Sequence, residues 1–210
     1  MNHLVLLGDS ILDNAAYTAG GPTVLAHLQA LLPADWKVSM LAVDGSVTDN
    51  VINQLALLPT DTTHLVVSAG GNNALLQSDF VSDPAKTVAD ALSRMSAIAQ
   101  QFALEYETML KTILARGLPT TLCTVYDPNF TEAPLQQIMQ TALVIFNDII
   151  LRQAIRAGFP VIDLRQVCTS SEDYANAIEP SVAGGAKIAA TIIKATTAHD
   201  FSTQRTTVYH

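Results

Sequence analysis

Short apolar segments alternate with longer helical patterns from one end of the chain to the other. The apolar segments are rich in β-branched and aliphatic residues and end near Gly, Asp or Asn clusters, as buried strands do. They occupy residues 3–7, 37–42, 64–68, 119–124 and 160–163. Between them the spacing predicts helices over residues 22–32, 49–57, 85–115, 134–157 and 184–197. Strands that alternate with helices form parallel sheets covered on both faces, so we expect an α/β protein, a three-layer α/β/α sandwich with five strands.

The length and composition of the chain are those of one folded domain. With 210 residues, 49% of them hydrophobic and 14% charged, the chain can bury a continuous core, and disorder is excluded. No linker or internal repeat divides it, so we expect a single domain over residues 1–210. Residues 196–210 are polar, and we expect them to form a loosely held tail.

Charge and hydropathy limit the partners of the chain. Its 11 basic and 19 acidic residues give a net charge of -8, which repels phosphate backbones, so we expect no nucleic-acid partner. No apolar run approaches the roughly 18 residues that span a bilayer, and no basic leader is present, so we expect a cytoplasmic protein without a membrane span. Cys123 and Cys168 are expected to be reduced core thiols. The low charge also suits a broad contact between subunits, so the sequence is compatible with a homo-oligomer.

Groups able to carry chemistry follow the first three predicted strands, each at the point where the strand ends. Ser10 follows the first strand, Gly45 the second and Asn72 the third. The carboxyl ends of parallel strands meet at one edge of the sheet, where open α/β folds bind their ligands. A hydroxyl, a glycine N–H and an amide are the groups that acyl transfer needs, an attacking oxygen and donors for the oxyanion.

Each of these residues also has a structural interpretation. Gly45 and the pair Gly70-Gly71 are typical of turns that need a positive φ, while Asn72 suits a turn and Asn73 a helix cap. For any one residue alone, the structural interpretation is the better one. The coincidence of three strand ends in order, each with a required group, favours catalysis.

The same segments resemble the motifs of the SGNH, or GDSL, family of serine hydrolases. The Gly-Asp-Ser block of the family matches residues 8–10, and its lone second-block glycine matches Gly45. Its Gly-x-Asn-Asp block matches residues 70–73, with asparagine at the last position. The resemblance covers nearly the whole chain, because spacing and strand order also agree. It implies a flavodoxin-like sheet, Ser10 as nucleophile, and an oxyanion hole of the Ser10 and Gly45 N–H groups with the Asn72 amide.

The last motif departs from the family. The family reads Asp-x-x-His-Pro-Ser just before its C-terminal helix, whereas residues 176–181 read Asn-Ala-Ile-Glu-Pro-Ser. The Pro-Ser pair keeps its usual place, so Glu179 stands where the histidine base of the family stands, and Asn176 where its aspartate partner stands. None of the five histidines falls near this position.

Two interpretations of this exchange stay open. In the first, Glu179 is the general base for Ser10, and Asn176 orients it by donating a hydrogen bond where a second carboxylate would repel it. An unperturbed glutamate has a pKa about 2 units below that of histidine, so desolvation would have to raise it. In the second interpretation, catalysis is weak or lost and the cleft binds a small ligand without turning it over.

Four more residues are candidates for lining the cleft, each with a structural alternative. They are Asp9, Asp13, Asn73 and Tyr126. No histidine pair has helical i, i+4 spacing and the two cysteines are far apart, so we expect no metal. A flavin- or nucleotide-binding domain is the rival α/β interpretation. The first turn lacks Gly-x-Gly-x-x-Gly and no Walker lysine follows a strand, so we expect no cofactor.

The sequence therefore predicts a hydrolase that cleaves a carboxylic ester, a thioester or an acetyl group of a small-molecule substrate through an acyl-serine intermediate. In this hypothesis Ser10 attacks, Glu179 accepts its proton and Asn176 orients Glu179. Gly45 and Asn72 would stabilise the oxyanion together with the Ser10 N–H. The alternative is a catalytically silent small-ligand-binding protein on the same fold.

Overall fold

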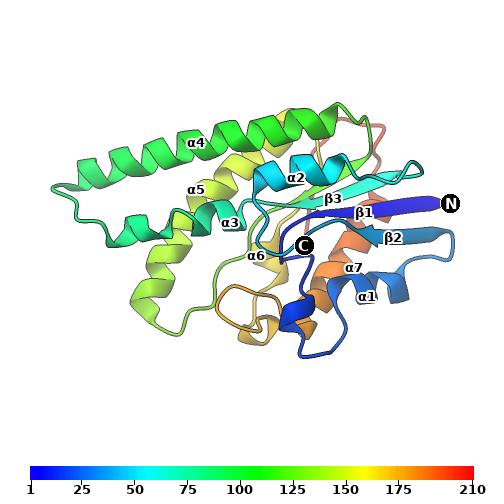
Figure 1. Ribbon diagram of the computed structural model, residues 1–210, viewed down its shortest axis with the longest axis horizontal. Coiled ribbons are helices and arrows are strands. Elements are labelled where there is room, and N and C mark those ends of the chain that lie inside the picture. The colour runs from blue at the N-terminus through cyan, green and yellow to red at the C-terminus, as the bar shows by residue number, and fades with distance from the viewer.

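The computed structural model describes residues 1–210, and a six-stranded parallel sheet forms its centre (Figure 1). The strands lie in the order β2-β1-β3-β4-β5-β6, and every neighbouring pair is parallel. Their bounds are β1 Asn2–Gly8, β2 Trp36–Met40, β3 His64–Ser68, β4 Thr120–Cys123, β5 Val161–Ile162 and β6 Val208–Tyr209. Parallel neighbours require crossovers, and the chain order places these crossovers in helices on both faces.

Helices cover the sheet on two sides, as the alternating pattern predicts. Their bounds are α1 Val24–Leu31, α2 Thr48–Leu55, α3 Gly71–Leu75, α4 Val88–Leu114, α5 Ala133–Ala157, α6 Leu164–Val167 and α7 Val182–Ala198. Helices α1, α6 and α7 lie on one face, where α1 packs on α7 and β2. Helices α2, α4 and α5 lie on the other face, where α4 contacts both α2 and α5. The three-layer α/β/α prediction is confirmed.

The C-terminal tail differs from the prediction. Residues 196–198 still belong to α7, and residues 208–209 add a sixth strand beside β5. The N–H of Val161 donates to the carbonyl of Thr207 and that of Asp163 to the carbonyl of Tyr209, both at 2.9 Å. The tail is therefore held by sheet pairing, and the expectation of five strands and a loose end was wrong. A strand of two residues is too short to show the alternation of apolar and polar residues by which strands are recognised in a sequence.

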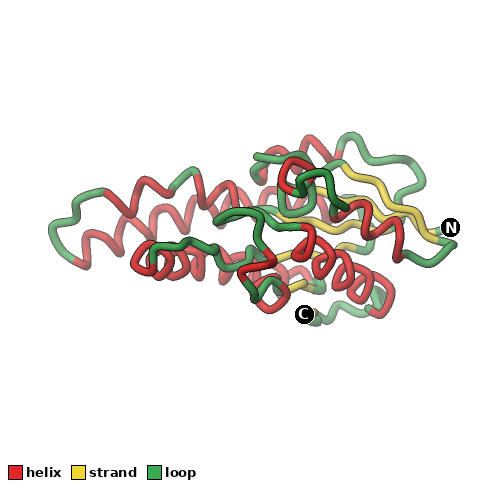
Figure 2. Tube along the Cα trace, turned by 90° about the horizontal axis from the view of Figure 1, so that it is seen from below, coloured by secondary structure: helices red, strands yellow, loops and turns green.

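Helices α4 and α5 extend well beyond the sheet (Figures 1 and 2). With 27 residues, α4 is about 40 Å long, whereas the seven residues of β1 span only about 23 Å. The buried residues of α4 all lie in its second half, from Phe102 onward. We call the projecting part the arm: residues 78–82, the first half of α4 (88–101) and the first half of α5 (133–145).

Helix α5 also meets the length and composition criterion for a membrane span, with a mean hydropathy of 1.3 over 18 residues. Only 22% of that window is buried, and a single helix of this length and composition is weak evidence for a membrane span. Its buried Asn147 accepts a hydrogen bond from the Val125 N–H and donates one to the Val125 carbonyl, both at 2.8 Å. These bonds attach α5 to the segment that follows β4.

Candidate active site

Ser10 lies directly beyond the end of β1, at the carboxyl edge of the sheet. Gly8 has a φ of +130°, and a Cβ there would lie 1.8 Å from the Ser68 carbonyl oxygen, so only glycine fits. The next residues form a tight turn, because the Leu12 and Asp13 N–H groups both donate to the Asp9 carbonyl. This turn leaves Ser10 only 6% exposed and facing the cleft described below.

Glu179 reaches the same cleft from the other end of the chain. Its side chain is 7% exposed, and the buried Oε2 atom has no hydrogen-bond partner. Burial raises the pKa of Glu179 above its ordinary value. The Ser10 hydroxyl opposes this rise, and the charge of Asp44 adds to it. The early hydroxyl and the late carboxyl therefore meet across one site.

Asn176 does not make the contact that the sequence predicts. Its Oδ1 accepts hydrogen bonds from the N–H groups of Ile178 and Glu179, at 2.9 and 3.0 Å. The exposed side chain thus closes an Asx turn on the backbone, as short polar side chains do in loops. Asn176 shapes the loop that presents Glu179 and donates nothing to its carboxylate, so the expected orienting bond is absent.

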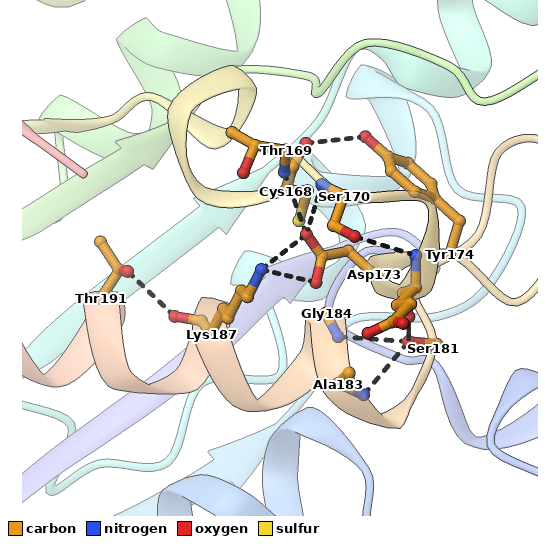
Figure 3. A network of polar contacts seen from close by, with 11 residues as sticks. Cys168, Thr169, Ser170, Asp173, Tyr174, Ser181, Ala183, Gly184, Lys187 and Thr191 are labelled. Atoms are coloured by element: carbon orange, nitrogen blue, oxygen red, sulfur yellow. Dashed lines mark hydrogen bonds and ion pairs between the residues drawn. The ribbon is translucent and has the colours of Figure 1, made fainter.

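An ion pair behind the loop fixes the start of the segment that carries Glu179 (Figure 3). The buried carboxylate of Asp173 receives the Lys187 ammonium at 2.8 Å and two backbone N–H groups, from Thr169 and Ser170, at 3.0 Å. Burial raises the pKa of Asp173, but these hydrogen bonds outweigh it and leave the pKa below its usual range. A Cβ on Gly184 would lie 2.1 Å from the Asp173 carbonyl oxygen, so α7 packs directly against the loop.

Two tyrosines hold the same loop in place: Tyr126, which follows β4, and Tyr174, which lies in the loop itself. The Tyr126 hydroxyl donates to the Ile178 carbonyl at 2.7 Å, and the Tyr126 ring meets Tyr174 edge-on at 5.3 Å. The Tyr174 hydroxyl, which has a single hydrogen to donate, lies 2.7 Å from the Asp127 carbonyl oxygen and 3.0 Å from that of Cys168. Burial holds the pKa of Tyr126 well above its ordinary value. Tyr126 lines the cleft, as the sequence predicts. The role of Tyr174 was not predicted, because a single aromatic residue in a loop belongs to no recognisable sequence motif.

Of the three expected oxyanion donors, Ser10 and Asn72 line the cleft, whereas Gly45 is not among its lining residues. Neither the Ser10 N–H nor the Gly45 N–H donates a hydrogen bond within the protein, and Gly45 has a φ of +79°. Asn72 lies in the cleft wall, where its Nδ2 donates to the Ser46 carbonyl at 3.0 Å. An amide nitrogen carries two hydrogens, so one remains for a ligand.

Asp13 and Asn73 lie outside the cleft, contrary to expectation. Asp13 accepts a hydrogen bond from the Asp44 N–H at 3.1 Å and so supports the loop that contains Gly45. Asn73 accepts from the Thr48 N–H and donates to the side chains of Thr48 and Glu105. These bonds join neighbouring elements to each other, and neither side chain is among the residues that line the cleft.

Asp9 lines the cleft but has an unusual environment. Its Oδ1 accepts from the Ile11 N–H at 3.2 Å and from the Ser68 hydroxyl at 3.4 Å, whereas its buried Oδ2 has no partner. The pKa of Asp9 is raised to about 7, mainly by burial. The hydrogen bond from the Ile11 N–H opposes this rise, and the charge of Glu179 adds to it. The site thus holds two desolvated carboxyl groups.

The cleft between these groups is mostly apolar. It encloses about 840 Å³, including its open mouth, and 15 of its 23 lining residues are hydrophobic. Asp9 and Glu179 are its only charged members, and no histidine lines it. No three His, Cys, Asp or Glu side chains cluster as metal ligands would. Both cysteines are buried and unpaired, with Cys123 fully buried in the core below the site.

The family of the chain follows from comparison with known proteins. The model of the GDSL-like lipase/acylhydrolase family matches residues 6–186. The chain therefore belongs to this family, and by class it is an esterase or acylhydrolase. Comparison with curated proteins finds no match.

Solved structures share the fold at low identity. An extracellular lipase from Streptomyces rimosus is 16% identical, with a TM-score of 0.68 over 93% of this chain and 100% of that one. A phospholipase A1 from Streptomyces albidoflavus is 16% identical, with a TM-score of 0.65 over 95% and 99%. A catalytic mutant of an acetylxylan esterase from Geobacillus stearothermophilus is 19% identical, with a TM-score of 0.62 over 93% and 94%.

Proposed function

We propose that the protein hydrolyses carboxylic esters, thioesters or acetyl groups by a serine mechanism in which Glu179 replaces the usual histidine. The observation that carries the proposal is that Ser10 and Glu179, from opposite ends of the chain, are both buried and line one cleft. No histidine lines this cleft, and its other carboxyl, Asp9, accepts hydrogen bonds from the Ile11 N–H and the Ser68 hydroxyl. We therefore assign the role of base to Glu179.

The chemistry needs no atom beyond the substrate and water. The Ser10 oxygen attacks the carbonyl carbon while its proton passes to Glu179, and the oxyanion forms at the Ser10 and Gly45 N–H groups and the Asn72 amide. The intermediate collapses, and the leaving alcohol or thiol takes the proton from Glu179. Water then attacks the acyl-serine, giving its proton to Glu179, and Ser10 leaves with that proton as the acid is released.

The environment of Glu179 offsets the weakness of a carboxylate base. A base works best when its pKa lies near the working pH, and an ordinary glutamate lies about 2 units below histidine. Burial and the charge of Asp44 both raise the pKa of Glu179. The unpartnered Oε2 atom adds to this effect, because it lacks the hydrogen bonds that would stabilise the ionised form.

Turnover of p-nitrophenyl acetate tests the proposal. We expect Ser10→Ala to abolish turnover and Glu179→Gln to lower kcat by about two to four orders of magnitude, as for the loss of a general base. The matched control is Glu172→Gln, an exposed glutamate in the same segment before α7, which should retain full turnover. Equal turnover by wild type and Glu179→Gln would remove Glu179 from the mechanism.

The silent binding protein is the second candidate, and the altered last motif is the observation that favours it. A pure binder would show no turnover of any ester and no covalent labelling at Ser10. Substitution of Ser10 by alanine would then leave ligand affinity unchanged.

A further inference from the structure

A second serine, Ser39, lies beside a histidine at the opposite end of the sheet from Ser10. His3 stands near the start of β1, and Ser39 lies on the neighbouring strand β2, in register with Val5 (Figure 1). The seven residues of β1 hold His3 and Ser10 roughly 20 Å apart. Neither His3 nor Ser39 lines the cleft, so this end of the sheet is a separate place on the molecule.

Ser39, His3 and Asp61 form a continuous row of hydrogen-bonding side chains. The Oγ atom of Ser39 lies 2.8 Å from Nε2 of His3, and Nδ1 of His3 lies 2.8 Å from Oδ1 of Asp61. A hydroxyl in contact with a base, which is in turn oriented by a third group, is the arrangement that activates serine for acyl transfer. Such a row is recognised by its geometry and not by its order along the chain.

The carboxylate determines where the protons of the row lie. Hydrogen bonds from Lys37 and from His3 lower the pKa of Asp61 to about 2, so this carboxyl is ionised at neutral pH and can only accept. The Nδ1 atom of His3 therefore carries a hydrogen. In the neutral ring Nε2 is then the acceptor, and the Ser39 hydroxyl donates to it, as a nucleophile does to its base.

The surrounding structure fixes the base but leaves the hydroxyl within reach of solvent. His3 is 2% exposed, its N–H donates to Oγ1 of Thr63 at 2.7 Å, and its carbonyl accepts from the Thr63 N–H at 2.9 Å. Ser39 is only half-buried, because β2 is an edge strand of the sheet. Side chains alternate along a strand, so Ser39 shares its face of β2 with the exposed Lys37.

We propose that Ser39 is an acyl-acceptor site, activated by His3 as base and by Asp61 as a positioning residue, and independent of the cleft. The Ser39 oxygen forms a bond to the acyl carbon of the donor, and the bond from that carbon to the leaving group breaks. The Ser39 proton passes to Nε2 of His3 and from there to the leaving group.

The chemistry of the leaving group defines the donors. Aryl esters, thioesters and acyl phosphates carry good leaving groups, and these are the compounds that Ser39 attacks. The product is an ordinary alkyl ester of serine, whose alkoxide is a poor leaving group. Ser39 is therefore acylated once and keeps the acyl group, which makes it a modification site and not a second centre of turnover.

Acetylation by p-nitrophenyl acetate tests the inference in the Ser10→Ala protein, whose cleft lacks its nucleophile. Fragmentation by mass spectrometry should place an acetyl group on Ser39, and the additional change Ser39→Ala should remove it. Ser93, an exposed serine on α4, is the reference within the same sample, and Ser39 should react about a hundredfold faster, as expected for general base catalysis. Acetylation of Ser39 no faster than that of Ser93 would overturn the inference.

Variants of Asp61 test the role of the carboxylate without disturbing the core. Asp61→Asn should slow the acetylation of Ser39 by about tenfold or more, because an amide can donate to Nδ1 and favour the wrong tautomer. Asp61→Glu keeps the carboxylate and should react faster than Asp61→Asn. The matched control is Asp35→Asn, an exposed aspartate just before β2, which should leave the rate unchanged. An unchanged rate in Asp61→Asn would also overturn the inference.

Replacement of the base completes the test. His3→Gln should lower the rate at Ser39 to that of Ser93, and a retained fast rate would overturn the inference. Since His3 is buried, circular dichroism must show that this variant folds, and the exposed Asp61 carries the test if it does not. All these rates are measured without Ser10, so the outcome does not depend on the proposed function.

Discussion

Replacing Asp9 by asparagine should change how stability depends on pH. The side chain is 1% exposed, and a rise of its pKa from 3.8 to about 7 means that the folded protein prefers the neutral carboxyl. The full difference corresponds to roughly 4 kcal/mol at about 1.4 kcal/mol per pKa unit. Because the folded pKa is the higher one, this stability is present below about pH 4 and is lost as pH rises to about 7.

The asparagine variant lacks that loss. Between about pH 5 and pH 8 the free energy of unfolding of Asp9→Asn should therefore gain about 2–3 kcal/mol relative to wild type. Any penalty from an amide N–H without a partner is independent of pH, so it cancels in this comparison. Urea unfolding followed by the fluorescence of Trp36, the single tryptophan, measures both proteins at each pH.

The matched control is Asp35→Asn at an exposed aspartate whose side chain makes no hydrogen bond. Its stability difference from wild type should stay constant over the same range. A constant difference for Asp9→Asn as well would refute the reasoning, because it would show that the buried carboxyl ionises as readily as an exposed one.

Three further predictions concern the loop and the base. Gly184→Ala should destabilise the fold by about 1–3 kcal/mol in urea, because its Cβ would clash with the Asp173 carbonyl, and a neutral result would contradict the close packing of α7. Lys187→Met should lower the free energy of unfolding by about 1–3 kcal/mol at neutral pH and by less below about pH 4. The reason is that the lowered pKa of Asp173 contributes stability only above the pKa of the unfolded chain. An equal cost at both pH values would count against the ion pair. The kcat/KM for ester hydrolysis should fall at acid pH as Glu179 takes up a proton, and Glu179→Gln should lack this limb in its residual activity. A limb retained in that variant would assign the titration to another group.

Strands and helices were predictable where their patterns were long. The aliphatic runs that became β1 and β3 are buried on both faces, and such runs are characteristic of parallel strands. Strand β6 was not predictable, since two residues pair with β5 only through backbone bonds. The arm could have been foreseen, because a helix of 27 residues is longer than any strand that it covers.

The site was predictable as far as chain order determines it. Ser10 and Asn72 follow neighbouring parallel strands, so topology alone brings them to one edge. Asn176, Asp13 and Asn73 were misplaced because each side chain accepts a hydrogen bond from a backbone N–H outside the cleft. The donor is local for Asn176, whereas for Asp13 and Asn73 it lies 31 and 25 residues away in the sequence. Side-chain torsions and tertiary contacts of this kind are not encoded by motif spacing.

Covalent labelling by a fluorophosphonate tests most directly whether the early serine is activated by the late carboxyl. Mass spectrometry should place the label on Ser10 in the wild type, and Ser10→Ala should remove it. The rate of labelling should fall by about two to four orders of magnitude in Glu179→Gln and remain unchanged in Glu172→Gln. A serine that stays unlabelled in the wild type, or one that reacts equally fast without the carboxylate, would contradict the account.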